Sequence, residues 1–534
     1  MSRSHAWLGA ALWLACATAS AASVNQGVMA LKEGNYAQAL AEFTPLAEKG
    51  DRAAQFDLAL MYSKGQGTTQ DYAQAAHWAA LSAAQGDVHA QLMLGMFYYK
   101  GQGVPQDYAQ AAQWLGKAAD QGDTIAQNNL GLLYRDGRGV ARDYDHAMSL
   151  FGRAAEKGDA AGEYNLGMMY AKALGIPQDD HQAVRWLTAS AQRGYPDAIN
   201  GLGVLYARGQ GVAKDPQKAV ELYRQAAALG NVLGQYNLAQ ALEHGTGIAR
   251  DYAQAAMLYQ VAAARGEAEA QVNLGVMYAK GRGVQQDYGA AVQWYRKAAD
   301  QGLGAAETDL GQAYAAGFGV QQDYRQAMLW FQKAALQNDP GGIVGIASLY
   351  RKGWGVPQDY QQAYAWYSKG AALGSGSAEV AIGTMYLNGE GRPQDYAQAL
   401  SWFQKAAGTG NVFAQTNIGM MYARGMGVPR DYAQAVSRFQ AGAEEGEPVS
   451  QYNLGLMYAN GWGVKKDPVA AYALCSLSAS EISIQAAPGT TVYAEREKLM
   501  RQLARQMNAG ERGAVSPLLQ DMQRLGVLEA LQAR

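Results

Sequence analysis

One interval governs this sequence: an aspartate recurs every 36 residues, twelve times in succession. The segment that carries it reads GQGVPQDYAQAA around Asp107, and most copies keep its glycines and the tyrosine after the aspartate. Because no copy gains or loses a residue, the chain is expected to stack equal units into a solenoid, each unit packing on its neighbours. The twelve aspartates are Asp71, Asp107, Asp143, Asp179, Asp215, Asp251, Asp287, Asp323, Asp359, Asp395, Asp431 and Asp467.

The first half of each unit has the pattern of an amphipathic helix. In the unit around residue 90, Asp87 is placed to cap the helix, and Ala90, Leu94 and Tyr98 recur every four residues, so they face the core. A glycine stands at the Gly103 position in all twelve units. This predicts a backbone with positive φ just past the helix end.

The second half of the unit predicts another helix. Asp107 begins a D-x-x-Q pattern close to a capping box, and the helix is expected to run to about Gln121. Ala111 and Ala119 are alanine in all twelve units, which lets the two helices approach closely. Trp114, or its equivalent in other units, is expected to supply the large side chain between them.

Residues 90–119 read A-x-x-x-L-G-x-x-Y-x-x-G-x-G-V-x-x-D-Y-x-x-A-x-x-W-x-x-K-A-A, which resembles the Sel-like repeat (SLR) of the tetratricopeptide class. The resemblance implies an all-α, right-handed superhelical solenoid of about twelve 36-residue helix-loop-helix repeats. It also implies an adaptor that holds other proteins, since exported bacterial members act in envelope signalling, secretion or host interaction. A cysteine-rich subgroup has been described as binding or hydrolysing β-lactams, but these repeats lack its paired cysteines.

The first 23 residues have the features of a secretory signal. They carry Arg3, a short apolar run, and small residues at Ala19 and Ala21 that suit cleavage. Lipidation at Cys16 is the alternative, although the preceding Trp13 is bulky for a lipoprotein signal. No later stretch approaches 18 consecutive apolar residues, so a periplasmic or secreted protein without a transmembrane segment is expected.

The repeat also defines the expected domain boundaries. We expect a signal peptide at 1–23, tetratricopeptide-like capping helices at 24–50, twelve repeats at 51–480 and a C-terminal helical cap at 481–534. Within this last segment, a final helix is expected after Pro517. A polar cap keeps the exposed end of a solenoid soluble.

Composition and motifs give no support for catalysis, a cofactor or a metal. The chain has 44 Lys and Arg against 46 Asp and Glu, so no basic field marks a nucleic-acid surface. The six histidines are scattered, and zinc-protease, serine-nucleophile and phosphate-loop signatures are missing, although His77 and His89 lie on successive predicted helices. Cys475 occupies a packing position, which favours a buried thiol.

One face of the first helices is the candidate binding surface. Positions equivalent to Leu92, Met96 and Tyr99 point about 140 to 200° away from the core stripe, so they are expected to face solvent in the concave groove. An exposed apolar stripe indicates a binding site, and the alternative is that these side chains only pack against the next unit. Gln240, Glu243, Thr308 and Gln312 make the middle units more polar. The predicted partner-binding residues are Phe56, Leu60, Leu92, Met96, Tyr99, Leu132, Tyr164, Met168, Tyr236, Met420, Tyr452 and Leu456.

These patterns favour an exported, non-catalytic adaptor that binds a protein or peptide segment in its groove. Two alternatives remain open. One is a cell-wall or β-lactam-interacting enzyme, which rests on family analogy alone. The other is a structural scaffold that associates with itself.

Overall fold

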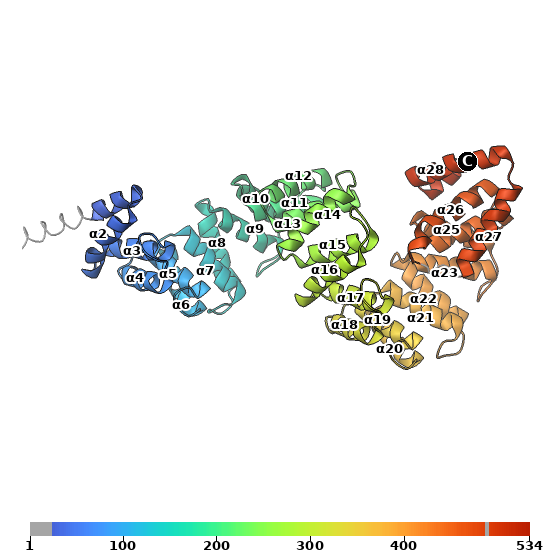
Figure 1. Cartoon of the computed structure of the whole chain (residues 1–534), viewed down its shortest axis with the longest axis horizontal. Coiled ribbons are helices and arrows are strands. Elements are labelled where there is room, and N and C mark those ends of the chain that lie inside the picture. The colour runs from blue at the N-terminus through green and yellow to red at the C-terminus, as the bar shows by residue number, and fades with distance from the viewer. Residues whose placement is uncertain (1–23, 486–490, 534) are drawn as a thin grey trace, which may run out of the picture. The chain divides into compact units, whose positions relative to one another are not determined.

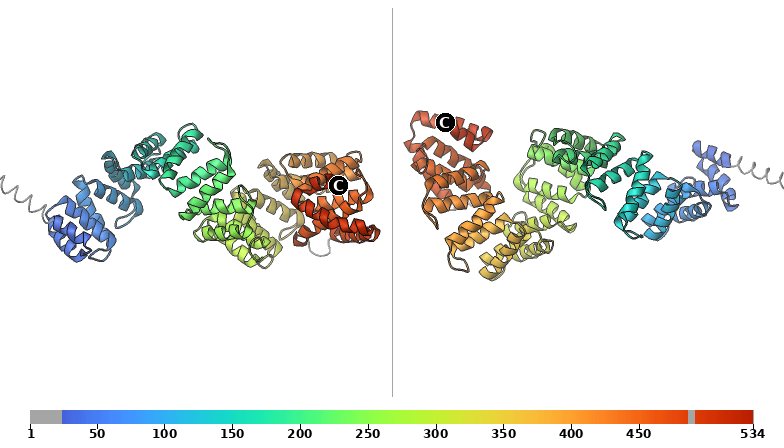
Figure 2. Two further views of the ribbon diagram at one scale, coloured as in Figure 1. Left: turned by 90° about the horizontal axis from the view of Figure 1, so that it is seen from above. Right: turned by 180° about the vertical axis from the view of Figure 1, so that it is seen from behind.

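The computed structural model describes residues 24–485 and 491–533, and all regular structure in these ranges is helical. The chain divides into two compact units, residues 1–267 and 268–534. Within each unit, helices that follow one another in sequence pack side by side (Figures 1 and 2). The predicted secretory signal and Cys16 lie outside the described residues.

Each repeat contains a first and a second helix, as predicted. The first helices are α3 (Arg52–Lys64), α5 (Val88–Lys100), α7 (Thr124–Asp136), α9 (Ala160–Ala171), α11 (Pro196–Arg208), α13 (Val232–His244), α15 (Ala268–Lys280), α17 (Gly304–Ala316), α19 (Pro340–Lys352), α21 (Gly376–Asn388), α23 (Val412–Arg424) and α25 (Pro448–Asn460). The second helices are α4 (Tyr72–Ala84), α6 (Tyr108–Asp120), α8 (Tyr144–Glu156), α10 (Asp180–Gln192), α12 (Pro216–Ala228), α14 (Tyr252–Ala264), α16 (Tyr288–Asp300), α18 (Tyr324–Leu336), α20 (Tyr360–Ala372), α22 (Tyr396–Gly408), α24 (Tyr432–Glu444) and α26 (Pro468–Gln485).

Capping aspartates begin the helices where the sequence predicted them. The Asp87 carboxylate accepts a hydrogen bond from the Ala90 amide at 2.9 Å, and Asp107 accepts from the amides of Ala109 and Gln110 at 2.9 and 3.0 Å. Each such bond satisfies an amide that has no partner inside the helix. The 36-residue spacing of aspartates is therefore a spacing of helix starts.

The second loop glycine is required for two reasons. All twelve glycines at the Gly103 position have φ between 68° and 74°, as predicted. The second reason could not be read from the sequence: a Cβ atom on Gly103 would collide with the backbone at Tyr72, where α4 of the preceding repeat begins. Glycine thus shapes the loop and also brings successive repeats together.

A second glycine position lets the two helices of a repeat approach closely. A Cβ atom on Gly95 would lie 2.8 Å from Cγ of Leu115, and one on Gly131 would lie 2.6 Å from Cε1 of Phe151. Trp114 packs against the hydrophobic core that includes Ala90, Leu94 and Phe97, as predicted, but Leu115 is the side chain that faces Gly95. The Lys117 ammonium lies 3.8 Å from the centroid of the half-buried Trp114 ring.

Helices outside the repeats flank the array. A final helix, α29, follows Pro517 as predicted, while Pro517 itself lies inside α28, which Asn508 and Glu511 begin with a capping box. In the parts of the chain that the structure describes, no helix is both long and apolar enough to cross a bilayer. The flanking helices are residues 24–32, α2 (Tyr36–Glu48), α27 (Thr491–Gln506), α28 (Ala509–Leu525) and α29 (Val527–Gln532).

One repeat offers a matched test of the close approach. Gly131→Ala places a methyl group against the Phe151 ring and is expected to lower the free energy of unfolding by about 1–3 kcal/mol. Gly152→Ala, inside α8 with no atom within 4 Å of the new Cβ, is expected to raise it by about 0.5–1 kcal/mol. Urea midpoints followed by circular dichroism measure both changes. Shifts of the same sign and size would show that the contact with Phe151 is unimportant.

Candidate functional site

The first-helix face consists of the positions equivalent to Leu92, Met96 and Tyr99. In residues 24–267, most side chains on this face are half-buried and Asn128 and Asn200 are buried, whereas the sequence predicted that this face lies in solvent. Leu92, Met96 and Tyr99 pack against a hydrophobic cluster formed mainly by α6 of their own repeat and α7 of the following repeat, and the Tyr164 ring lies 5.4 Å from that of Tyr195. Each still keeps part of its surface open. The half-buried predicted residues in this unit are Phe56, Leu60, Leu92, Met96, Tyr99, Leu132, Tyr164, Met168 and Tyr236.

The predicted residues in the second unit differ from one another. Met420 and Leu456 are half-buried, but Tyr452 is only 7% exposed, so the prediction that it faces solvent is wrong. The C-terminal helices explain the difference, since Glu495 on α27 and Cys475 on α26 are near enough to act on the Tyr452 phenol, whose pKa is raised mainly by burial. Tyr452 therefore belongs to the packing of the last repeat.

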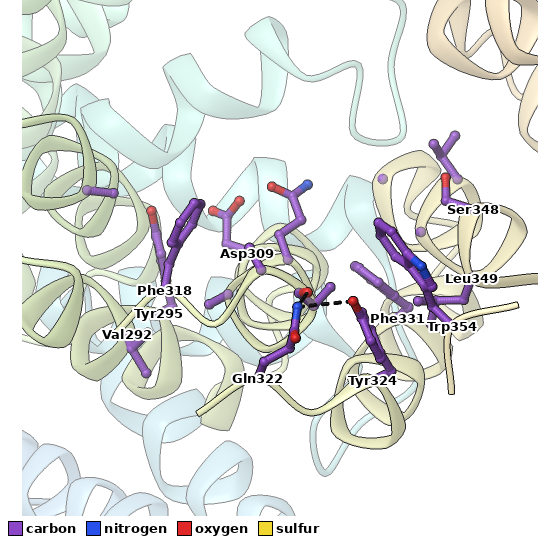
Figure 3. A pocket seen from close by; sticks show the side chains of 18 of the residues that line it. Val292, Tyr295, Asp309, Phe318, Gln322, Tyr324, Phe331, Ser348, Leu349 and Trp354 are labelled. Carbon is purple, nitrogen blue, oxygen red and sulfur yellow. Dashed lines mark hydrogen bonds between the residues drawn. The ribbon is translucent and has the colours of Figure 1, made fainter. Parts of the chain in front are cut away.

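A hollow opens on the first-helix face in the second unit. It has a volume of about 780 Å³ and lies mainly over α17 and α19 (Figure 3). Its lining includes Gln312 and Ser348, which stand at the position of Met96 in their repeats, and Val344, which stands at the position of Leu92. The hollow therefore lies at the register that the sequence singled out, in the repeats where side chains are smaller and more polar.

Small residues create this hollow. Ala315 stands where α5 has Tyr99, and Gly341 and Gly345 remove side chains from the adjacent turns of α19. A Cβ atom on Gly345 would lie 2.6 Å from the Phe331 ring, so that ring fills the space and lines the cavity. Substitution by larger residues from other repeats would close the site.

Aromatic rings form the ends of the hollow. Phe318 and Trp354 occupy the middle of the two-glycine loops and are 48% and 38% exposed. Phe318 stacks on Tyr288 with ring centroids 4.8 Å apart, and Trp354 stacks on Tyr324 at 5.1 Å. In Figure 3, Phe318 lies on one side of Asp309, and Trp354 and Phe331 lie on the other.

Asp309 is the ionisable side chain that projects into this apolar setting. Two equivalent asparagines in the first unit bond to the preceding first helix: Asn165 donates to Asn128, and Asn237 to Asn200, both at 2.8 Å. A third, Asn129, donates to the Ile125 carbonyl of its own helix. In the repeat before Asp309, the position that Asn128 holds before Asn165 is occupied by the apolar Val272. Among the described residues, no group donates a hydrogen bond to the Asp309 carboxylate.

Burial raises the pKa of Asp309 to about 7, with a further contribution from the Asp339 carboxylate and an opposing one from Lys280. The charge of Asp309 also affects Tyr295. Burial raises the pKa of the Tyr295 phenol, and the Asp309 carboxylate raises it further. Asp339 itself is engaged, since it accepts hydrogen bonds from the Thr308 hydroxyl at 2.7 Å and the Gly342 amide at 3.0 Å. The Asp309 carboxylate therefore has no hydrogen-bond donor within the described repeats and can accept a hydrogen bond from a bound ligand.

Candidate groups elsewhere are accounted for by packing. Cys475 is fully buried, as predicted, and burial raises its thiol pKa to about 12. The ring of His77 lies 5.1 Å from Trp78, and that of His89 lies 5.9 Å from Phe56. In residues 24–485 and 491–533, no three His, Cys, Asp or Glu side chains gather as they would around a metal ion.

The hollow could not be predicted from the sequence, although its signals are present there. Phe318 and Trp354 replace the polar residues that most two-glycine loops carry, and Asp309 replaces the common asparagine. Alone, each substitution looks like ordinary variation between repeats. Their convergence depends on the packing of α16, α17, α18 and α19, which the structure supplies.

The described architecture, tandem helix pairs with a ligand-sized hollow on the first-helix face, defines a helical-repeat protein of the tetratricopeptide class. The Sel1 repeat family model matches twelve consecutive segments between residues 52 and 481. The chain therefore belongs to the Sel1 repeat family, whose fold is a general scaffold for protein interaction.

The solved structures that are similar to it include the following two. A protective antigen of uropathogenic Escherichia coli strains displaying an SLR fold is 31% identical, over 92% of this chain and 96% of that chain, with a TM-score of 0.45. A Sel1 repeat protein from Oxalobacter formigenes is 33% identical, over 55% of this chain and 86% of that chain, with a TM-score of 0.42. No curated protein matches the sequence.

The pKa of Asp309 leads to a test by stability. Since its folded-state pKa is raised to about 7 from an ordinary 3.8, the folded state holds the proton more tightly, and stability is lost as pH rises from about 4 through 7. Asp309→Asn removes this loss. The free energy of unfolding of Asp309→Asn, minus that of the parent, is expected to be about 1–2 kcal/mol larger at pH 8 than at pH 5, because solvent in the open hollow reduces the effect of burial.

Urea midpoints at the two pH values measure this difference. Asp300→Asn, at an exposed position on the neighbouring helix α16, is the control for the loss of one negative charge. An advantage of Asp309→Asn that is the same at pH 5 and pH 8 would contradict the burial of this carboxyl group.

Proposed function

We propose that this protein is an exported, non-catalytic adaptor that binds a segment of a partner protein along its first-helix face, the concave groove of the solenoid. Its role would lie in envelope signalling, secretion or host interaction. The observation that carries the proposal is the 780 Å³ hollow over α17 and α19, at the register of Leu92, Met96 and Tyr99. A cavity of about 300–1,000 Å³ with apolar walls and a few polar groups is typical of a binding site.

The half-buried apolar side chains support the same face in the first unit. Met96 and Tyr99 hold their neighbours by packing and still present apolar surface that a partner can cover. Hydrophobic contacts along successive first helices suit an extended or helical segment, which gains from many shallow contacts. The proposed partner-binding set keeps the predicted residues on this face, except Tyr452, and adds the residues around the hollow.

Export is proposed from the features of residues 1–23. The enzyme alternative rests on relatives with paired cysteines, whereas Cys475 is buried in a packing position. Self-association has no residue-level observation in its favour, so a second function is not proposed.

The proposal is tested by closing the hollow with residues that other repeats already tolerate. The double variant Gln312→Met and Ala315→Tyr copies Met96 and Tyr99 of α5 into α17. Partners are captured from envelope extract and culture medium on residues 24–534, identified, purified and titrated. We expect the double variant to weaken binding of the identified partner by about 10-fold or more, because it fills the site.

Two further variants locate the contact. Met96→Glu, Tyr164→Glu and Met420→Glu together test the rest of the first-helix face, and Leu329→Glu on α18, 52% exposed, tests a second helix. Circular dichroism confirms that helicity is retained. Equal affinity of the parent and both first-helix variants, with loss in Leu329→Glu, would place binding on another face and overturn the proposal.

A further inference from the structure

The chemistry around the hollow indicates what kind of side chain it takes. Its lining is mostly apolar and aromatic, with Phe331 below and Phe318 and Trp354 at its ends. The Asp309 carboxylate stands among them without a hydrogen-bond donor from the described residues. A half-buried carboxylate of this kind is stabilised most by a cation that brings its own hydrogen-bond donors.

The repeat array itself shows that Asp309 is not there for packing. Asn165 and Asn237 occupy the same register and are satisfied by an asparagine one repeat earlier, whereas the residue one repeat before Asp309 is Val272, 8% exposed. An asparagine at 309 would cost less desolvation than a carboxylate at the same place. Asn, Gly, Ala and Met also occupy this register in other repeats, so packing within the array does not require a charge there.

We infer that the hollow binds an arginine side chain of an extended partner segment, with the guanidinium on the Asp309 carboxylate and the neighbouring apolar residues of the segment against Phe318 and Phe331. This inference rests on the proposed function and names the chemistry of the partner at that same site. Arginine combines five hydrogen-bond donors with a flat face that stacks on aromatic rings and an apolar stem that suits an aromatic wall.

Charged groups around the hollow fix where the cation sits. Lys352 already covers the Trp354 ring, with its ammonium 4.0 Å from the ring centroid, so that ring is left for apolar contact. Lys280 opposes a second cation near Asp309, while the Asp339 carboxylate adds to the attraction. The place for the guanidinium is the Asp309 and Tyr295 side of the cavity, where Figure 3 shows both side chains.

The cavity favours a peptide over a free amino acid or a sugar. At 780 Å³ it takes more than one side chain, and it lies on the face that continues along α17 and α19. A neutral sugar would stack on Phe318 or Trp354 and leave the Asp309 charge without a cation. Sugar binding is therefore a separate outcome of the test.

The test uses residues 24–534 and an array of peptides of about 12 residues, each with a central arginine. The tightest peptide is resynthesised with citrulline, which keeps the shape and removes the charge. Fluorescence anisotropy with fluorescein-labelled peptides gives both affinities. We expect arginine to bind about 10-fold or more tighter than citrulline, and Asp309→Asn to abolish that difference while Asp300→Asn leaves it unchanged.

The pH dependence provides a readout that a structural role for Asp309 would not move. Asp309 must be ionised to pair with the guanidinium, and its pKa is raised to about 7, so affinity for the arginine peptide should rise about 10-fold from pH 6 to pH 8. Tyr295, Lys280 and Asp339 are the ionisable groups facing Asp309. The citrulline peptide should show no such rise.

The outcomes separate this inference from the proposed function. Equal binding of arginine and citrulline peptides, lost in the double variant Gln312→Met and Ala315→Tyr, would overturn the arginine inference and leave groove binding standing. No peptide bound at millimolar concentration, or chitooligosaccharide bound in their place, would overturn the inference. The adaptor proposal would then be decided by the captured partner alone.

Discussion

The fold depends on how closely the two helices of a repeat approach at one small residue. This residue is glycine in nine repeats and alanine in three, Ala59, Ala239 and Ala347. At Gly95 and Gly131 the facing side chain lies where a Cβ atom would stand, and at Gly131 it is the fully buried ring of Phe151. Dense packing of this kind fixes the distance between the helices. The second loop glycine then fixes the distance between repeats, because the loop backbone lies against the start of the preceding second helix.

Because these glycine contacts lie away from the first-helix face, the side chains on that face can vary between repeats. The positions of Gly103, Ala111 and Ala119 hold the same residue in every repeat, whereas positions equivalent to Leu92, Met96 and Tyr99 carry apolar, polar or very small residues. The hollow lies where the side chains are very small, at Ala315, Gly341 and Gly345 in adjacent turns of α17 and α19. The face that we propose binds a partner therefore varies more between repeats than the core does.

The parts of the structure that depend on neighbouring residues in the chain could be predicted. Asp87 and Asp107 cap their helices and Gly103 has a left-handed backbone, because each effect acts within a few residues. The sequence predicted Trp114 as the large side chain between the helices but did not identify Leu115 as the residue that faces Gly95, since one residue turns a side chain by about 100° around a helix. The burial of Tyr452 and the hollow depend on contacts between segments far apart in sequence, which periodicity does not contain.

The central claim is that a partner occupies the hollow on the first-helix face. Amide hydrogen exchange of the full mature chain, with and without the captured partner, tests it most directly. The account predicts slower exchange in the loops 317–323 and 353–359 and at the ends of α17 and α19 that border the hollow. Slower exchange confined to the second helices, with these loops unchanged, would contradict it.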